Sequence, residues 1–211
     1  MKKLTPTSYA ILSLLALRPW TAYELAQQMH RNVGPYWARA ERGIYDEVKN
    51  LVTHGLAQAN EEHHGRRPRS MNRITPAGRI ALRDWLATPL TTTLQIESEA
   101  VLRVAFAEHG SREDLLACLV ALRAQVAELA LVGVRIGEDY LAGVGTYPER
   151  VHLIGLVMAF LIDHLESADA WARWASEQVT TWPDVQAPAD PRAALEIIEQ
   201  TVTRARALAF P

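Results

Sequence analysis

A chain of 211 residues, 49% of them hydrophobic, is long and apolar enough to bury a substantial core, which excludes a disordered or low-complexity protein. Its single cysteine excludes an internal disulfide and suits a reducing compartment. The net charge of −2 hides an asymmetry: residues 1–88 hold 13 Lys and Arg against 7 Asp and Glu, whereas residues 89–211 hold 9 against 17. A basic part joined to an acidic part indicates that the basic part meets nucleic acid.

The chain shows no signal-peptide pattern, because its opening MKK is followed by an amphipathic stretch without a small-residue cleavage site. The most apolar run, LIGLVMAFLI at 153–162, has ten residues, well short of the roughly 20 that a membrane-spanning helix needs. We therefore expect a soluble, cytoplasmic protein with no membrane contact.

Capping signals divide the basic part into short helices. Thr5-Pro6 predicts a first helix that stops at Arg18-Pro19, and TAYE at 21–24 is a capping box that opens a second helix. A third helix is predicted from about Glu41 to His54-Gly55, followed by a β-hairpin with a basic tip over 56–74. Thr75-Pro76 then opens a fourth helix. Three helices, a hairpin and a helix within residues 1–88 predict a winged helix-turn-helix.

Beyond a candidate linker at 88–94 the pattern is entirely helical. Helices are predicted at about 96–108, from Ser111 to Leu141, at about 149–178 with Thr146 and Glu149 as its cap, and from Asp190-Pro191 after a Pro-rich loop. We divide the chain into a DNA-binding domain at 1–88, a helical dimerisation and ligand-sensing domain at 95–179, and a Pro-rich linker with a terminal helix at 180–211. The predicted fold class is mainly α, a winged helix-turn-helix with a small β-hairpin wing plus an all-α C-terminal dimerisation domain.

One predicted helix carries a heptad-like seam. Its members recur at alternating steps of three and four: Leu153, Val157, Phe160, His164, Ser167, Trp171 and Trp174. Such a seam suits burial against a helix of the same chain or of a second copy, and we favour a dimer for the set. Leu153, Val157, Phe160, His164 and Trp171 are the candidate dimerisation residues.

Several motifs of the first 88 residues occur together in a characteristic order. They are LTPTSYAILSLLALRPWTAYELAQQM, GIYDEVKNLVTHGL and GRRPRSMNRITPAGRIALRDWL. In this order and spacing they resemble the N-terminal domain of the PadR family of transcriptional regulators. ESEAVLRVAFAE and the long helices after it resemble the branch of the family with a larger helical C-terminal domain. The resemblance implies a homodimeric regulator whose DNA affinity often responds to a small molecule. In the family, Asp46-Glu47 is usually a non-acidic and then an apolar residue, and Met71-Asn72 is usually a pair of aromatics.

The third helix supplies the candidate reading face. On a helical wheel Ile44, Val48, Leu51 and Val52 form its core side. The opposite side mixes hydrogen-bond donors and acceptors, as base-edge reading requires. Its candidate DNA-binding residues are Arg42, Gly43, Tyr45, Asp46, Lys49 and Asn50.

Phosphate attraction is expected from the wing, because a basic loop can enter a minor groove or hold the backbone. The candidates are Arg66, Arg67 and Arg69, with Arg39 just before the reading helix. Such a loop is also found as a merely solvated surface, and its place in this domain favours DNA contact.

Catalysis and metal binding are not indicated. His63-His64 lacks helical ligand spacing, and HLES at 164–167 does not form a nucleophile, base and orienter. We expect no enzyme activity, no cofactor and no metal. Trp85, Trp171 and Trp174 are tentative ligand-binding residues for a small aromatic effector, although ordinary core packing explains them as well.

The resulting hypothesis is a sequence-specific, ligand-responsive homodimeric repressor that binds double-stranded DNA at an inverted-repeat operator. The alternatives are a winged-helix protein-interaction module without DNA binding and a small helical hydrolase. Steep salt dependence of DNA affinity distinguishes the first from the second.

Overall fold

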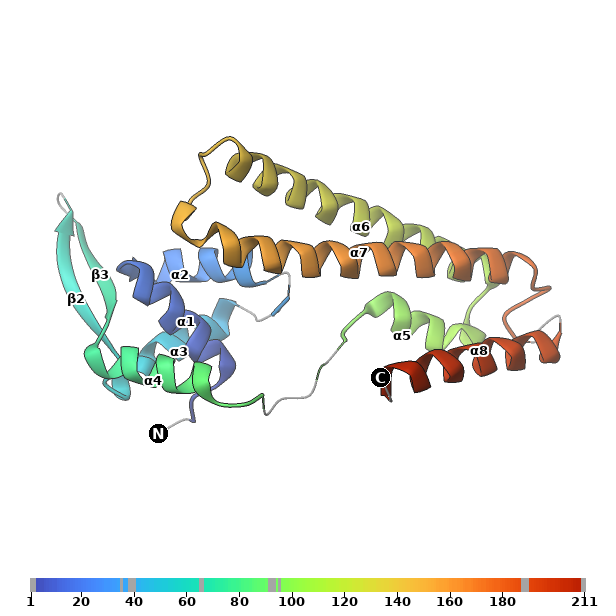
Figure 1. Cartoon of the computed structure of the whole chain (residues 1–211), viewed down its shortest axis with the longest axis horizontal. Helices are drawn as coiled ribbons and strands as arrows, with labels where there is room; N and C mark the ends of the chain where they lie inside the picture. Colours follow the sequence, from blue (N-terminus) through green and yellow to red (C-terminus); the bar gives the residue numbers. More distant parts are fainter. Residues whose placement is uncertain are drawn as a thin grey trace. The chain divides into compact units, whose positions relative to one another are not determined.

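The computed structural model describes residues 3–34, 36–37, 41–64, 67–90, 94, 96–186 and 190–209, with the backbone alone at 32, 41–42, 62–64, 67–68 and 191. The chain divides into two compact units, Met1–Leu94 (unit 1) and Gln95–Pro211 (unit 2). Each unit is considered by itself below (Figure 1).

Unit 1 contains four α-helices and a small sheet among its described residues. The elements in chain order are α1 (Pro6–Leu17), β1 (Trp20–Thr21), α2 (Ala22–Gln28), a π-helical turn η1 (Met29–Val33), α3 (Glu41–Thr53), β2 (Ala57–His64), β3 (Arg67–Ile74) and α4 (Pro76–Ala87). The three helices, hairpin and fourth helix predicted from the sequence are therefore confirmed as a winged helix-turn-helix.

The capping signals act as predicted. The Thr5 side chain accepts a hydrogen bond from the Ser8 backbone N–H while the Ser8 hydroxyl accepts one from the Thr5 N–H, which closes a capping box on α1. Thr21 and Glu24 form the same arrangement at the start of α2. After α3 the chain turns at Gly55 with φ of +68°, a left-handed conformation that glycine adopts without steric cost.

The sheet has the order β1-β3-β2, and both pairings are antiparallel. The β2–β3 hairpin is the predicted wing, whereas β1 was not predicted because two residues leave no alternation to detect. Asn72 explains how β1 attaches: it lies opposite Trp20, and its buried side-chain amide donates to the Trp20 carbonyl at 3.2 Å. An amide thus stands where the resembled family has an aromatic, and it holds the first strand.

The core of unit 1 is closed by residues from every helix of the helix-turn-helix. Its fully buried members include Ile11, Leu12, Trp20, Leu25, Ile44 and Leu51. Trp20 also donates its indole N–H to the Leu14 carbonyl at 2.9 Å, so its polar atom is satisfied on burial. The stacked rings of Tyr9 and Trp85, 4.9 Å apart, join α1 to α4.

Unit 2 is helical throughout its described residues. Its elements are α5 (Glu99–Ala105), a 3-10 turn η2 (Ala107–His109), α6 (Arg112–Leu141), a 3-10 turn η3 (Pro148–Arg150), α7 (Val151–Thr180) and α8 (Pro191–Ala209). The Ser111–Asp114 capping box predicted for α6 is present. The predicted Thr146–Glu149 cap is wrong, because Pro148–Arg150 forms η3 and α7 begins after Arg150 without a side-chain cap.

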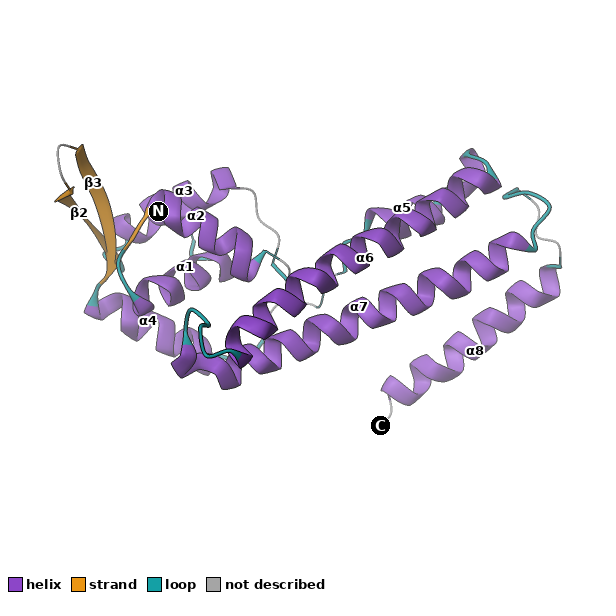
Figure 2. Cartoon of the chain, turned by 90° about the horizontal axis from the view of Figure 1, so that it is seen from above, coloured by secondary structure: helices purple, strands orange, loops and turns teal. Residues whose placement is uncertain are grey.

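The two long helices α6 and α7 run side by side (Figures 1 and 2). Gly133 and Gly137 of α6 permit close approach, since a Cβ added there would lie 3.5 Å from Ile162 and 3.3 Å from Met158 of α7. At the other end, Arg123 of α6 donates to the Asp169 carboxylate of α7 at 2.8 Å. The pair is therefore fixed by small residues at one end and an ion pair at the other.

Two helical stretches of unit 2, Arg112–Leu141 and Pro148–Thr180, are long and apolar enough to cross a membrane by length and composition alone. The sequence-based test on an unbroken ten-residue run was therefore too strict, because a long helix can be apolar on average while interrupted by polar residues. One or two such helices are weak evidence for a membrane protein, since core helices of soluble proteins pass the same test.

Candidate nucleic-acid interface

Helix α3 has one buried and one exposed side. Ile44, Val48 and Leu51 are buried, as the helical wheel predicted. Gly43, Tyr45, Asp46, Lys49 and Thr53 are exposed. The exposed side therefore presents a carboxylate, an ammonium group and a phenol close together along the helix. These groups can accept from, and donate to, base edges and phosphates.

The buried side is rotated from its predicted position. Asn50 is 8% exposed, so its predicted place on the outer face is wrong, whereas Val52, predicted in the core, is 37% exposed. The cause is that α3 packs against both α1 and α2, which extends burial toward Asn50 and Glu47 rather than toward Val52. Asn50 cannot reach a base from this position, and we withdraw it from the reading face.

Gly43 lies at the start of the outer face in open space. A Cβ added there would meet nothing within 4 Å. Packing within the described residues therefore does not require glycine at this position, and the close approach of Gly43 to a duplex remains a prediction.

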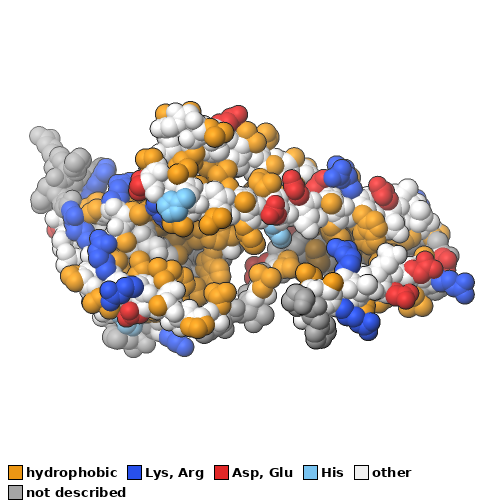
Figure 3. Space-filling view, in the orientation of Figure 1, with side chains coloured by type: hydrophobic (Ala, Val, Ile, Leu, Met, Phe, Trp, Pro, Cys, Tyr) orange, Lys and Arg blue, Asp and Glu red, His pale blue; other side chains and the backbone are white. Residues whose placement is uncertain are grey.

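The wing presents basic residues beside the helix-turn-helix. Arg69 and Arg73 of β3 are exposed, and Arg69 lies opposite Glu62 in the hairpin register. Lys and Arg side chains gather on unit 1 toward the edge that the wing occupies (Figure 3). Arg66 lies outside the described residues, and Arg67 is described by its backbone, at the first position of β3.

Two further candidate DNA-binding residues lie just before α3 or in its first turn. Arg39 lies outside the described residues, and Arg42 is described only as the second residue of α3. Both remain predictions.

Electrostatics links the wing to α2. The pKa of Glu24 lies below its ordinary value, first because the Thr21 backbone N–H donates to its carboxylate, an effect that outweighs partial burial, and further because Arg18 and Arg69 lie nearby. Arg69 is thus close enough to the start of α2 for its charge to be felt there.

The tryptophans proposed for ligand binding fall in different environments. Trp85 stacks on Tyr9 within unit 1, whereas Trp171 packs against the core of unit 2 and Trp174 is 41% exposed. Core packing accounts for Trp85 and for much of Trp171. Trp174 alone of the three presents substantial aromatic surface.

Most of the α7 seam lies on the surface of unit 2. Leu153, Val157 and Phe160 are 46%, 39% and 58% exposed, and His164 is exposed as well. Trp171 departs from the set, because it is half-buried against the core that Leu115 and Ala172 help to form. Among the described residues of unit 2, the seam is thus only partly covered over its first three turns.

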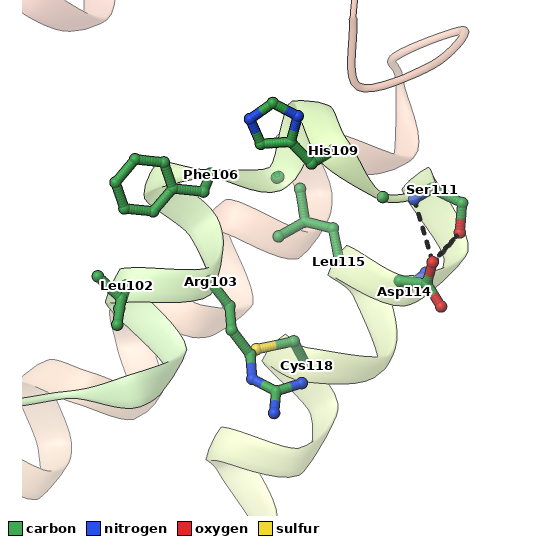
Figure 4. A pocket seen from close by; sticks show the side chains of 10 residues that line it. Leu102, Arg103, Phe106, His109, Ser111, Asp114, Leu115 and Cys118 are labelled. Atoms are coloured by element: carbon green, nitrogen blue, oxygen red, sulfur yellow. Dashed lines mark hydrogen bonds between the residues drawn. The ribbon is translucent and has the colours of Figure 1, made fainter.

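Unit 2 also contains a pocket of about 380 Å³ between α5 and the start of α6. Leu102, Phe106, Leu115 and Cys118 line it with apolar atoms, and Arg103 and His109 stand around it (Figure 4). The guanidinium of Arg103 is already engaged, since it donates to Glu99 on its own helix at 2.6 and 2.9 Å. The pocket therefore offers apolar contact with one cationic group at its side.

An α2–α3 helix-turn-helix followed by a β2–β3 wing defines the class of winged helix-turn-helix proteins. Comparison with known proteins points to one family within this class. The profile of the transcriptional regulator PadR-like family matches residues 11–84, which span α1 to α4. The winged helix-turn-helix of unit 1 is therefore similar to the PadR-like family of transcriptional regulators.

Two characterised relatives match at low identity. A probable transcriptional regulator of Mycobacterium tuberculosis is 27% identical over 127 residues, 56% of this chain and 67% of that protein. The negative transcriptional regulator PadR of Bacillus subtilis is 26% identical over 107 residues, 50% of this chain and 59% of that protein.

Solved structures match over a greater length. The Bacillus subtilis PadR in complex with operator DNA superposes with a TM-score of 0.64 at 20% identity, covering 82% of this chain and 98% of that one. Its complex with p-coumaric acid gives 0.61 at 19% identity, covering 84% and 99%. At such identities these matches show the fold, which includes the helical second unit.

Proposed function

We propose that this protein is a cytoplasmic, homodimeric, ligand-responsive transcriptional repressor that binds double-stranded DNA at an inverted-repeat operator. The observation that carries the proposal is the division of α3. Its inner side closes the core of unit 1, while Tyr45, Asp46 and Lys49 are exposed on its outer side. Exposed donors and acceptors on the second helix of a helix-turn-helix suit the major groove.

The wing supplies the charge that α3 lacks. Arg69 and Arg73 are exposed on β3, and Arg67 opens the same strand. Each phosphate that such a residue neutralises releases counterions, so affinity falls as salt rises. We assign these arginines to the backbone or minor groove and the outer face of α3 to base edges.

Dimerisation follows from the surface of α7. Phe160, Val157 and Leu153 expose apolar area along one stripe, and water disfavours a stripe of this length on a lone soluble unit. A second copy related by a two-fold axis would bury the stripe with its own. Two α3 helices would then meet successive major grooves, roughly 34 Å apart, which is why we expect an inverted repeat.

The effector is proposed by analogy and by chemistry. The Bacillus subtilis relative has been solved with p-coumaric acid. In this chain Trp174 offers exposed aromatic surface, and the α5–α6 pocket offers about 380 Å³ lined by Leu102, Phe106 and Leu115. A small aromatic acid fits the apolar lining and the neighbouring guanidinium.

The experiment is a binding titration on duplexes taken from the DNA upstream of the protein's own gene, repeated from about 50 to 200 mM salt. We expect affinity to fall by orders of magnitude over that range, and a panel of aromatic acids to lower it further at fixed salt. Binding that is absent, or that is insensitive to salt, would favour the alternative of a protein-interaction module.

A further inference from the structure

A carboxylate is buried beneath the candidate reading face. Glu47 of α3 is 4% exposed, and the hydroxyl of Ser8 in α1, 0% exposed, donates a hydrogen bond to its Oε2. The two residues are 39 positions apart in the chain, so the bond ties the reading helix to the first helix of the domain. Glu47 follows Asp46 directly and lies two residues before Lys49, both on the outer face.

Ser8 is oriented for this role by its own helix. Its hydroxyl oxygen accepts the Thr5 backbone N–H at 2.9 Å in the capping box that starts α1. Accepting that bond uses a lone pair of the oxygen, and the hydroxyl proton is donated separately to the Glu47 carboxylate. The result is a relay from the Thr5 amide through Ser8 to α3, in which each bond polarises the next.

The neighbouring residue of α1 holds the chain just before α3. Trp37 donates its indole N–H to the Thr7 hydroxyl at 2.9 Å, and Thr7 is 3% exposed. Thr7 and Ser8 lie in the same turn of α1. One directional bond from this turn thus reaches Glu47 in the second turn of α3, and the other reaches Trp37, which precedes α3 in the chain.

An ordinary core would not place a carboxylate there. Ile44, Val48 and Leu51 share the buried side of α3 with Glu47, and an apolar side chain of similar size at 47 would continue that surface. Burying a carboxylate costs free energy, and its hydrogen bonds offset only part of that cost. A buried polar pair of this kind therefore contributes little net stability, and it is better suited to fixing how the two helices are oriented.

We propose that the Ser8–Glu47 bond is a positioning device that sets the rotation of α3 about its axis, and thereby the direction in which Asp46 and Lys49 meet base edges. This proposal rests on the proposed function, in which the outer face of α3 reads DNA. Ser8 and Glu47 touch no DNA themselves. Removing their bond lowers sequence preference while attraction to phosphates is retained.

The test begins with the wild-type protein and a random duplex library, from which repeated selection yields the preferred duplex. Affinities for that duplex and for a scrambled one are then compared among Ser8→Ala, Glu47→Leu, the double variant Ser8→Ala/Glu47→Leu and Glu47→Gln. Thermal unfolding is recorded for each. Ser13→Ala is the matched control, since Ser13 lies on the same helix and its hydroxyl donates to the Tyr9 carbonyl within α1, at 2.9 Å.

Ser8→Ala and Glu47→Leu are each expected to unfold at a lower temperature than the wild-type protein. In Ser8→Ala, for example, the buried carboxylate loses the Ser8 donor. Replacing both partners by apolar groups removes the cost of the buried carboxylate. The Ser8 part of the α1 capping box stays lost in both Ser8 variants, so duplex preference is compared between Ser8→Ala and the double variant at a temperature where both are folded. We expect the preference for the selected duplex to fall roughly tenfold or more in the double variant, while affinity for the scrambled duplex stays within about twofold. Glu47→Gln keeps an acceptor for the Ser8 hydroxyl, and it and Ser13→Ala are expected to retain the preference.

Three results would overturn the proposal. A double variant with wild-type preference, or a Glu47→Gln variant that loses preference as completely as the double variant, contradicts the positioning role alone. Failure of the wild-type protein to select any duplex contradicts the proposed function and, with it, the positioning role.

Discussion

The two units differ in how much of their apolar surface they bury. Unit 1 buries large apolar residues from α1, α2 and α3 around one centre, with Ile11, Leu25, Ile44 and Leu51 at most 1% exposed. Unit 2 has longer helices but a smaller described core, made of Leu115, Leu119, Ala172, Ala175 and Val179. Many of its other large apolar residues are on the surface, and orange side chains are spread along its helices in Figure 3.

The difference indicates how each unit is stabilised. Unit 1 buries the large apolar residues of α1, α2 and α3 in one core, although Ile80 and Leu86 of α4 are exposed, and the outer face of α3 carries polar groups suited to reading DNA. Unit 2 leaves a stripe on α7, and the amphipathic helix α8 exposes Leu195, Ile198 and Val202. An isolated amphipathic helix gains little in water, so we expect assembly to complete unit 2.

The largest effect is expected from breaking that assembly. Charges at two seam positions, Val157→Glu with Phe160→Glu, should prevent burial of the α7 stripe and yield monomers. Affinity for the selected duplex should then fall about a hundredfold or more, because one half-site no longer assists the other. Sedimentation equilibrium measures the assembly, and Ala170→Glu, at an exposed position of α7 off the seam, is the control. An undiminished dimer in the double variant would show that α7 is not the interface.

A smaller loss is expected on the reading face. Lys49→Ala removes one exposed donor from α3 without touching the core, so thermal unfolding should be unchanged. Affinity for the selected duplex should fall by about 10- to 100-fold, the worth of a good base contact, and affinity for a scrambled duplex should change much less. Equal losses on both duplexes would assign Lys49 to a phosphate instead.

A substitution in the wing should weaken binding to the selected and the scrambled duplex alike, in contrast to Lys49→Ala. Arg69→Ala removes a charge that we assign to the backbone, so it should weaken all duplexes alike and lower the slope of log affinity against log salt by about one. Fluorescence anisotropy over a salt series gives this slope. A change confined to the selected duplex would place Arg69 against bases.

The smallest effect concerns acid stability of unit 1. Because the folded-state pKa of Glu24 lies below its ordinary value of 4.5, the carboxylate contributes stability that is present above that value and is lost as pH falls through the folded-state pKa. Glu24→Gln removes this contribution, so the variant should be slightly less stable at pH 7 and should lose less on acidification. Denaturant unfolding at neutral and acidic pH tests the pattern, and parallel pH profiles for the two proteins would contradict it.

Local signals made much of unit 1 predictable. Thr5, Thr21 and Gly55 mark helix ends by short-range hydrogen bonding or backbone freedom, and each acts where the sequence placed it. Strand β1 and the π-helical turn after α2 have no such signal, because two to five residues carry no periodicity. Both elements depend on tertiary contacts, which form only when the domain folds.

The candidate site was harder to predict than the fold. A helical wheel assumes that apolar residues alone decide which side is buried, and it therefore placed Asn50 outside and Val52 inside. The structure reverses both, since α3 packs against both α1 and α2, and Glu47, next to Asn50 on the wheel, is buried against Ser8 of α1. A tertiary hydrogen bond across 39 residues cannot be found from periodicity.

The central claim is that two copies of this chain read DNA through the outer faces of α3. Selection from a random duplex library, followed by measurement of the mass of the complex, tests it most directly. The account predicts an inverted repeat whose half-sites are centred about 10 base pairs apart, bound by two chains. Selection of no sequence, or a complex of one chain on a single unrepeated site, would contradict it.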